Sequence, residues 1–188
     1  MVIAILLLVL SSGCVHEEEE TEIKEISIPG HYHSYIFSYD IRESLNVTSS
    51  DPDAIMNLVG SADVLDIVFD GSSEEDNSYF SIALFNIASK LNNYFIYEGK
   101  IWKSQIFYYI GDHWYNSSTE EIEKPELGPA IWFLGPNTNA TETSVKLVDN
   151  IIYIQGTSGK DIELAADKFS LNVMGIRKVD PSLTGQAS

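Results

Sequence analysis

The amino-acid sequence predicts a single α/β (α+β) domain in which a mixed β-sheet carries two main amphipathic helices. Short apolar runs rich in β-branched residues, such as 64–70 and 130–134, have the length and composition of buried strands. Two longer segments repeat apolar residues at spacings of three and four, as one face of a helix requires. No internal repeat divides the chain, so we expect residues 26–178 to form one domain.

Composition and charge narrow the classes of function. Hydrophobic residues make up 44% of the 188 residues, which supplies a packed core and is unlike the composition of a disordered chain. The formal net charge of −17 repels DNA, RNA and anionic lipid head groups, so nucleic-acid binding is the least expected of the large classes. Cys14 is the only cysteine, so once it is used the chain has no disulfide and no thiol chemistry.

Local signals place the elements of the first half of the domain. Asp51-Pro52 is a typical helix start, and a capping box at Ser72 or Ser73 begins a second helix with Phe80 and Leu84 on its apolar face. This helix follows a strand, as in the first half of a βαβ unit. The expected elements are a strand at 31–41, a helix at 53–59, a strand at 64–70 and a helix that ends near 90–93.

Turn and cap residues place the elements of the second half. Asp149-Asn150 separates two β-branched runs and predicts a hairpin turn. Thr157 or Ser158 caps a final helix, which Gly175 ends in a left-handed conformation. The expected elements are two or three aromatic strands within 94–115, an acidic loop at 116–129, strands at 130–134, 143–148 and 151–155, and a helix with Ile162, Ala166, Phe169 and Val173 on one face.

The N-terminal segment predicts export. An apolar run from Val2 to Leu10 is too short to span a bilayer, and small residues and Cys14 follow it. The pattern resembles a lipoprotein signal, in which residues 1–13 are removed as a signal peptide and Cys14 carries the lipid. Ser11 stands where such signals usually have Leu, and no Lys or Arg precedes the apolar run. An ordinary export signal and a buried apolar N-terminus are the alternatives.

Charged and polar segments flank the expected domain. Residues 14–25 contain six glutamates and one lysine, and this block of like charge predicts a short, solvated tether. Residues 179–188 form a polar tail. Three Asn-X-Ser/Thr sequences begin at Asn46, Asn116 and Asn139, and each is a candidate glycosylation site of an exported protein.

One C-terminal stretch resembles a known group of proteins. In residues 131–176 a strand runs into Gly135-Pro136-Asn137, then a hairpin around Val145–Asn150, then a helix that contains Ala165-Ala166-Asp167-Lys168. This order is similar to a module of archaeal surface-layer-like proteins and uncharacterised archaeal lipoproteins. The resemblance covers about a quarter of the chain. It implies a setting in the cell envelope and no particular reaction.

Four acids form the main candidate ligand site. Asp70 ends a predicted strand at the edge where open α/β sheets bind ligands, and Glu74, Glu75 and Asp76 follow it. These residues are a candidate cation or ligand site, with Asp70 also a candidate general base of a surface hydrolase. The alternative is that acids at a helix N-terminus stabilise the helix dipole. The EF-hand pattern fails because its twelfth position is Ser81, so no metal site is assigned.

Histidines and aromatic residues give weaker candidates. His31 and His33, two apart on the expected strand, point to a shared metal only if a third ligand such as His113 joins them. The glycine loop at 156–161 lacks the spacing of a phosphate loop and is better explained as a helix cap. An aromatic surface that stacks on sugar rings is expected as an alternative to core packing. Its candidates are Trp102, Tyr108, Tyr109, Trp114 and Tyr115.

These observations favour a lipid-anchored protein on the extracellular face of the cell membrane, without catalytic activity or cofactor. Its expected role is structural or in protein interactions at the cell surface, with the membrane as a partner through the N-terminal lipid and no nucleic acid. A surface lipoprotein that binds a small molecule, sugar or cation is the first alternative. A surface hydrolase that uses Asp70 is the second.

Overall fold

A strand, a helix and a second strand form the centre of the fold. The structure, a computed structural model, describes residues 21–180 and 183–184. Strands β4 (Leu65–Asp70) and β5 (Ser104–Ile110) run parallel, joined by helix α3 (Glu74–Tyr97). The predicted βαβ unit is therefore confirmed. Residues 1–13 and Cys14, on which the expected signal peptide and lipid depend, lie outside the described residues.

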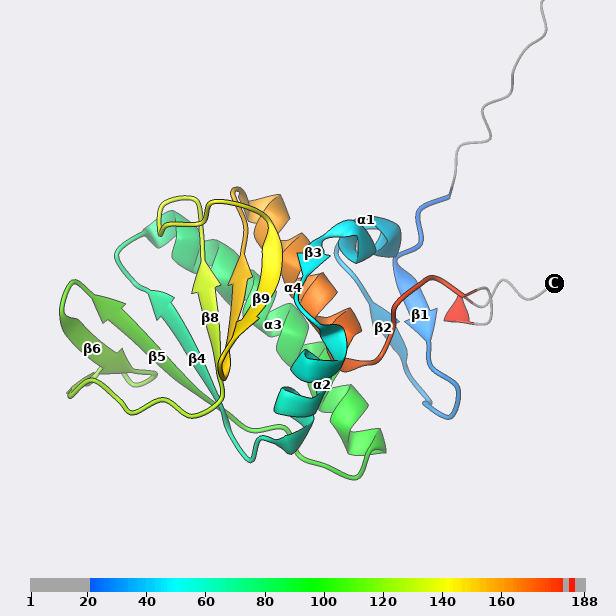
Figure 1. The fold of residues 1–188 in the computed structure, drawn as a ribbon, viewed down its shortest axis with the longest axis horizontal. Coiled ribbons are helices and arrows are strands. Elements are labelled where there is room, and N and C mark those ends of the chain that lie inside the picture. Colours follow the sequence, from blue (N-terminus) through cyan, green and yellow to red (C-terminus); the bar gives the residue numbers. More distant parts are fainter. Residues whose placement is uncertain (1–20, 181–182, 185–188) are drawn as a thin grey trace, which may run out of the picture.

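These strands belong to a mixed eight-stranded sheet on which four helices of the described chain pack (Figure 1). The strand order is β3-β9-β10-β8-β4-β5-β6-β7, with β4, β5, β8 and β10 parallel to one another. The single α/β domain with a mixed sheet is confirmed. The remaining elements are β1 (Glu25–Ser27), β2 (Ser34–Ile36), α1 (Ile41–Asn46), β3 (Thr48–Ser49), α2 (Pro52–Ser61), β6 (His113–Asn116), β7 (Glu121–Ile122), β8 (Ala130–Leu134), β9 (Ser144–Val148), β10 (Ile151–Gln155) and α4 (Gly159–Val173).

The main core lies between one face of the sheet and helices α3 and α4. Alternate residues of the central strands, such as Ile67, Ile131 and Ile152, are fully buried in one cluster with Phe80 of α3 and Phe169 of α4. Each such side chain contributes about 1.5–3 kcal/mol to the free energy of folding. The predicted apolar faces of both helices point into this core.

Helix α4 is buried on two sides, because a second, smaller core lies on the side away from the sheet. Leu171 and Met174 pack there with Ile26, Tyr35 and Ile41, which come from the β1–β2 hairpin and the start of α1. The fold therefore has three layers, with α4 in the middle one. Figure 1 shows the hairpin and α1 beyond α4, on the side opposite to β6.

The predicted helix caps are confirmed. Ser73 Oγ accepts a hydrogen bond from Asp76 N at 3.2 Å at the start of α3, and Ser158 Oγ accepts one from Asp161 N at 3.2 Å at the start of α4. Gly175 has a φ of 73°, a left-handed conformation that costs other residues more, and it follows the end of α4.

The strand expected at 31–41 is wrong over most of its length. Only Ser34–Ile36 is a strand, and Ile41 already begins helix α1. The reason is a local cap, because the Asp40 carboxylate accepts a hydrogen bond from Arg42 N at 2.8 Å. This cap ends the extended backbone before residue 41.

The strand expected to begin at residue 94 is also wrong there. Residues 94–97 continue α3, because Phe95 is buried in the main core on the same helix face as Leu91. Aromatic residues are frequent in strands, but they fit a half-buried surface of either kind. The strands expected later in that segment are confirmed as the antiparallel pair β5–β6.

The end of the expected tether lies against the domain. Ile23 N donates a hydrogen bond to the Asp40 carboxylate at 3.2 Å, and Ile41 N donates one to Ile23 O at 2.8 Å. Glu25 is the first residue of β1. Among the described residues, no helix combines the length and the apolar character that a membrane span needs.

Candidate functional site

A row of aromatic side chains crosses the sheet face opposite to α3 and α4. Since Ile131 and Ile152 face the helices, their neighbours Trp132 and Tyr153 face the other way, and strand register brings Tyr109 and Trp114 to the same side. Ring centroids lie 6.2 Å apart for Trp132–Tyr153, 5.9 Å for Tyr109–Trp132 and 5.2 Å for Tyr109–Trp114. We call Tyr109, Trp114, Trp132 and Tyr153 the aromatic strip.

The aromatic strip is accessible over most of its length. Tyr109, Trp132 and Tyr153 are half-buried, whereas Trp114 is only 8% exposed, with the Lys124 ammonium 5.8 Å from its ring centre. Val68 on the central strand is completely buried on this side. Trp132 stacks on Tyr153 with the ring planes 26° apart, whereas Tyr109 meets Trp132 edge-on at 61°. The three partly exposed rings therefore form an aromatic surface of differently tilted rings, and Trp114 supports it at one end.

Polar groups border the strip. Asp70 is paired in register with Tyr109. Burial and the negative charge of Asp70 raise the pKa of the Tyr109 hydroxyl, and a hydrogen bond with Trp132 partly offsets this rise. Next to Tyr153 in register lies Lys146, which forms an ion pair with Glu142. Hydrogen-bonding groups thus lie at both sides of a surface of ring faces.

Two of the five aromatic residues expected in a sugar-stacking surface lie in the strip, namely Tyr109 and Trp114. Tyr108 and Tyr115 stack on each other on the opposite, helix-side face, with centroids 5.1 Å apart. Trp102 packs against the main core. The sequence did not predict that Trp132 and Tyr153 belong to the strip. The alternation of residues along one strand indicates which side chains share a face, but it does not indicate which residues of distant strands become neighbours.

The four acids of the expected ligand site do not converge on a common point. The buried Asp76 carboxylate accepts hydrogen bonds from Asn137 N at 3.0 Å, Asn137 Nδ2 at 2.9 Å and Thr138 Oγ1 at 2.9 Å. It therefore holds the loop after β8. Glu75 accepts a hydrogen bond from Tyr79 Oη at 2.7 Å, and the exposed Glu74 belongs to the first turn of α3.

Asp70 is the one acid of this group on the face of the strip. Its Oδ1 accepts a hydrogen bond from Ser72 N at 2.9 Å, which shapes the turn into α3. The position next to Tyr109 leaves the carboxylate beside the rings. Within the described residues, no three His, Cys, Asp or Glu side chains are grouped so as to hold a metal ion.

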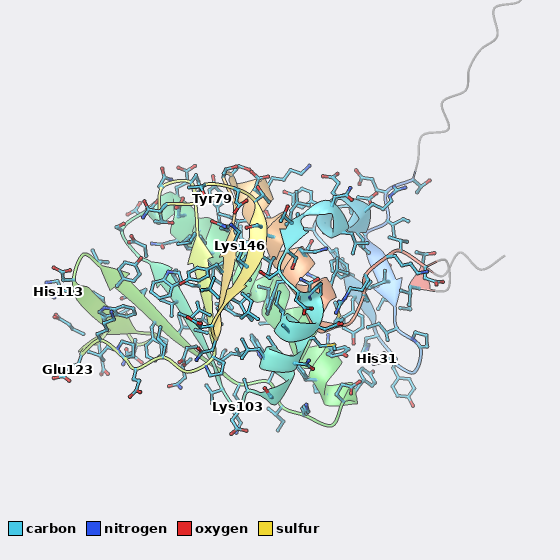
Figure 2. All side chains as sticks on the ribbon, in the orientation of Figure 1. His31, Tyr79, Lys103, His113, Glu123 and Lys146 are labelled. Carbon is cyan, nitrogen blue, oxygen red and sulfur yellow. The ribbon has the colours of Figure 1, made fainter. Side chains whose placement is uncertain are left out.

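His31 and His33 both lie near the ring of Tyr97, whereas His113 lies far from them. Figure 2 shows His31 and His113 at opposite ends of the molecule. His31 stacks on Tyr97 at 4.3 Å and shares a hydrogen bond with Tyr35, so it helps to seat the β1–β2 hairpin on α3. His113 pairs with Glu121 at 2.8 Å, which raises the pKa of the imidazole.

The three candidate glycosylation sites have different surroundings. Asn139 is exposed in the loop after β8 and has a φ of 72°. Asn116 ends β6, where its side-chain oxygen accepts hydrogen bonds from Ser118 N at 2.9 Å and Glu120 N at 3.1 Å. Asn46 is the last residue of α1. All three lie at the surface or partly exposed, and their modification stays a prediction.

Comparison with known proteins found no match to this chain. No known protein family matches the chain, and neither the curated proteins nor the solved structures contain a significant match to it.

Proposed function

We propose that this chain is a lipid-anchored protein of the cell surface that acts by binding rather than by catalysis, and that the aromatic strip binds carbohydrate. The observation that carries the proposal is the set of half-buried rings of Tyr109, Trp132 and Tyr153 on the sheet face without helices. A packed core does not require partly exposed aromatic rings on a sheet face that no helix covers, and a cluster of such rings is typical of a binding surface.

Carbohydrate fits this surface chemically. A sugar ring presents C–H groups on its faces and hydroxyls at its edge, so it stacks on an aromatic face while its hydroxyls reach polar groups beside the ring. Asp70 and the Tyr109 hydroxyl supply such groups at one side of Trp132, and Lys146 supplies a donor next to Tyr153. The strip runs across the sheet from Tyr153 on β10 through Trp132 on β8 to Tyr109 on β5, and this length suits a chain of sugars better than a single small molecule.

Charge selects among carbohydrates. The chain carries a formal net charge of −17, so it repels polyanionic saccharides. Asp70 beside the rings adds a local negative charge. The proposed ligand is therefore an uncharged or amino-sugar polymer of the cell envelope.

The proposed location rests on the sequence. The apolar run before Cys14 and the acidic segment after it support an anchor that holds the domain near the membrane surface. Mass spectrometry of the protein from its own membranes tests this part. A chain that begins at Cys14 with added lipid supports it, and a chain that keeps Met1 without lipid refutes it.

Isothermal titration of the full chain with uncharged oligosaccharides of glucose and of N-acetylglucosamine tests the binding. We expect binding by at least one series, and a dissociation constant raised at least about tenfold by Trp132→Ala or Tyr153→Ala. Phe85→Ala is the matched control, because Phe85 is an aromatic residue 73% exposed on α3. It should bind like the parent.

Folding is checked separately for each variant by circular dichroism. If the folded parent binds none of these saccharides, or if Phe85→Ala loses as much affinity as a folded Trp132→Ala, the carbohydrate proposal fails. Trp132→Phe gives a milder test, because it keeps a ring face on the strip and should retain most of the affinity.

A further inference from the structure

The sheet is wider than the helical layer that covers it. Neighbouring helices pack about 8–10 Å apart and strands about 4.8 Å apart, so one helix covers about two strands. Helix α4 contacts β9 and β10, and α3 contacts β4. Within the described part of the chain no helix packs extensively on β5, β6 or β7, although Ile106 of β5 packs against the main core. Figure 1 shows β5 and β6 extending past α3.

The uncovered part of this face is apolar. Phe69, Tyr108 and Tyr115 form a stack that leads outward from the core, with centroids 5.8 Å and 5.1 Å apart. Ile110, on the same face as Tyr108, is 45% exposed. A cavity of about 110 Å³ lies where this surface meets α3, lined by Phe69, Phe80, Ser81, Leu84, Ile106 and Phe133.

After its acidic first turn, the outer side of α3 is uncharged. Between Asn77 and Tyr97 the only charged residue is Lys90, and Lys90 is buried. Three large apolar side chains stand out from this side, with Ile82 48%, Phe85 73% and Ile96 65% exposed. Their spacings of three and eleven residues place them on one stripe. The polar exposed residues next to or between them on the helix are Ser81, Ser89 and Asn92.

An uncharged stripe is unusual on a protein with a formal net charge of −17. Two copies of this chain repel each other at most orientations, because like charges face each other. Along residues 77–97 of α3 they can approach without that repulsion, since the exposed acids Glu74, Glu75 and Glu98 lie only at the two ends of the helix. The small Ser81 and Ser89 let two helices come close. The surface therefore favours a second copy over a charged partner of either sign.

We propose that the surface formed by the outer side of α3 and the helix-side face of β5 and β6 binds a second copy of this chain. The α3 helices of the two copies lie antiparallel across a two-fold axis, and each extends the helical layer over the partner's β5–β6 hairpin. The contact is self-complementary, as a two-fold interface requires.

The size of the surface sets the strength of the dimer. Helix α3 has 24 residues and is roughly 36 Å long. The α3 part of this surface, a strip of that length about 10 Å wide, is by itself less than the ~800 Å² per partner of a standard interface, so the contact reaches standard size only if the whole β5–β6 face joins it. The dimer is therefore weak for a chain free in solution and strengthened for two chains held on one membrane, where anchoring raises the effective concentration.

Sedimentation equilibrium of the full chain in density-matched detergent tests the dimer. We expect a reversible monomer–dimer equilibrium and a dissociation constant raised at least about tenfold by Phe85→Glu, because two added carboxylates meet near the axis. Val148→Glu is the matched control, because Val148 is 53% exposed at the end of β9. It should change the constant by no more than about twofold. A folded chain that stays monomeric, or equal effects of both variants, overturns the proposal.

Cysteine cross-linking in membranes tests the antiparallel arrangement. A mixture of Ser78→Cys chains and Ile96→Cys chains should form disulfide-linked pairs, whereas Ser78→Cys alone should form no more than the parent chain. Pairing by Ser78→Cys alone, without pairing in the mixture, refutes the antiparallel arrangement. Quenching of a fluorophore on Phe85→Cys by spin-labelled phosphatidylcholine would assign this surface to the membrane and also overturn the dimer.

Discussion

Lys90 and Asp167 form an ion pair inside the helical layer, with Nζ and Oδ1 3.1 Å apart and the side chains 5% and 1% exposed. The pair joins α3 to α4, and the second Asp167 oxygen accepts a hydrogen bond from Ser38 N at 3.1 Å. The ammonium also lies 4.9 Å from the centre of the Phe37 ring. Burial raises the pKa of Asp167, and Lys90 opposes this. The pair thus fixes α4 between the two cores.

Removing one partner of this pair should be costly. We expect Lys90→Met to lower the free energy of unfolding by about 3–5 kcal/mol, because it leaves a buried carboxylate without its cation. Adding Asp167→Asn should recover part of the loss, since the amide oxygen still accepts from Ser38 N. Urea denaturation of the two variants measures the difference.

The same comparison has a pH dependence. In Lys90→Met the uncompensated Asp167 has a raised pKa in the folded state, so the folded state binds the proton more tightly than the unfolded state. The loss should therefore shrink as the pH falls and Asp167 becomes neutral. A loss that is the same at neutral and acidic pH, or a double variant less stable than Lys90→Met, would contradict this assignment.

Asp40 should contribute stability that is lost in acid. Hydrogen bonds from Arg42 lower the pKa of Asp40 to about 2 from the model-peptide value of 3.8, and the Asp40 side chain is 7% exposed. A lowered pKa stabilises the folded state above the unfolded value of 3.8 and ceases to do so as the pH falls through 2. Asp40→Asn should cost about 2 kcal/mol at neutral pH, and this cost should disappear as the pH falls through the folded pKa.

Denaturation of the parent and Asp40→Asn at a series of pH values measures this difference, and subtraction cancels the titration of the other acids. Asp53→Asn is a suitable control, because Asp53 is 74% exposed although it pairs with Arg177. A difference between Asp40→Asn and the parent that persists unchanged to the lowest pH would refute the linkage.

Two glycines should respond to alanine in opposite directions. At Gly156 a Cβ atom would overlap the backbone of Asp161 and Ile162 at the start of α4, which cannot give way cheaply. Gly60 lies in α2, where the nearest atom to an added Cβ is Lys100 Nζ at 4.0 Å. Thermal unfolding should show Gly156→Ala destabilised by at least about 2 kcal/mol and Gly60→Ala stabilised by about 0.5–1 kcal/mol.

Substitution of Asp76 and of Asp70 should show that Asp76 contributes to stability and Asp70 to binding. Asp76→Asn points an amide N–H₂ at the donors of Asn137 and Thr138, so it should lower the free energy of unfolding by about 3 kcal/mol. Asp70→Asn keeps an acceptor for Ser72 N and should change it by no more than about 0.5 kcal/mol.

The saccharide titration completes that comparison. Asp70→Asn should weaken binding to the aromatic strip, because the carboxylate lies beside Tyr109, whereas Asp76→Asn should leave binding unchanged while it is folded. If Asp70→Asn unfolds readily and Asp76→Asn does not, the structural assignment of the two acids is reversed.

Local features of this fold were predictable from the sequence. The caps at Ser73 and Ser158, the hairpin turn at Asp149 and the left-handed Gly175 each depend on a few neighbouring residues, and each is confirmed. The predicted end of the strand near Asp40 was wrong, because the aromatic pattern of residues 31–41 favoured a strand and the capping role of the single Asp40 side chain was not recognised.

The candidate site was predictable only in part, because it depends on contacts distant in the sequence. Asp76 stands among acids at a helix start, where charge alone explains it, and its partner Asn137 is 61 residues away. Trp132 and Tyr153 become neighbours only through the parallel register of β8 and β10. No local pattern specifies that register.

The place of α4 between the two cores has a consequence for how the chain reaches its folded state. Neither the main core nor the smaller core under the β1–β2 hairpin is complete until residues 159–173 are present. During synthesis these residues emerge after every strand, so the chain leaves the ribosome without a finished core.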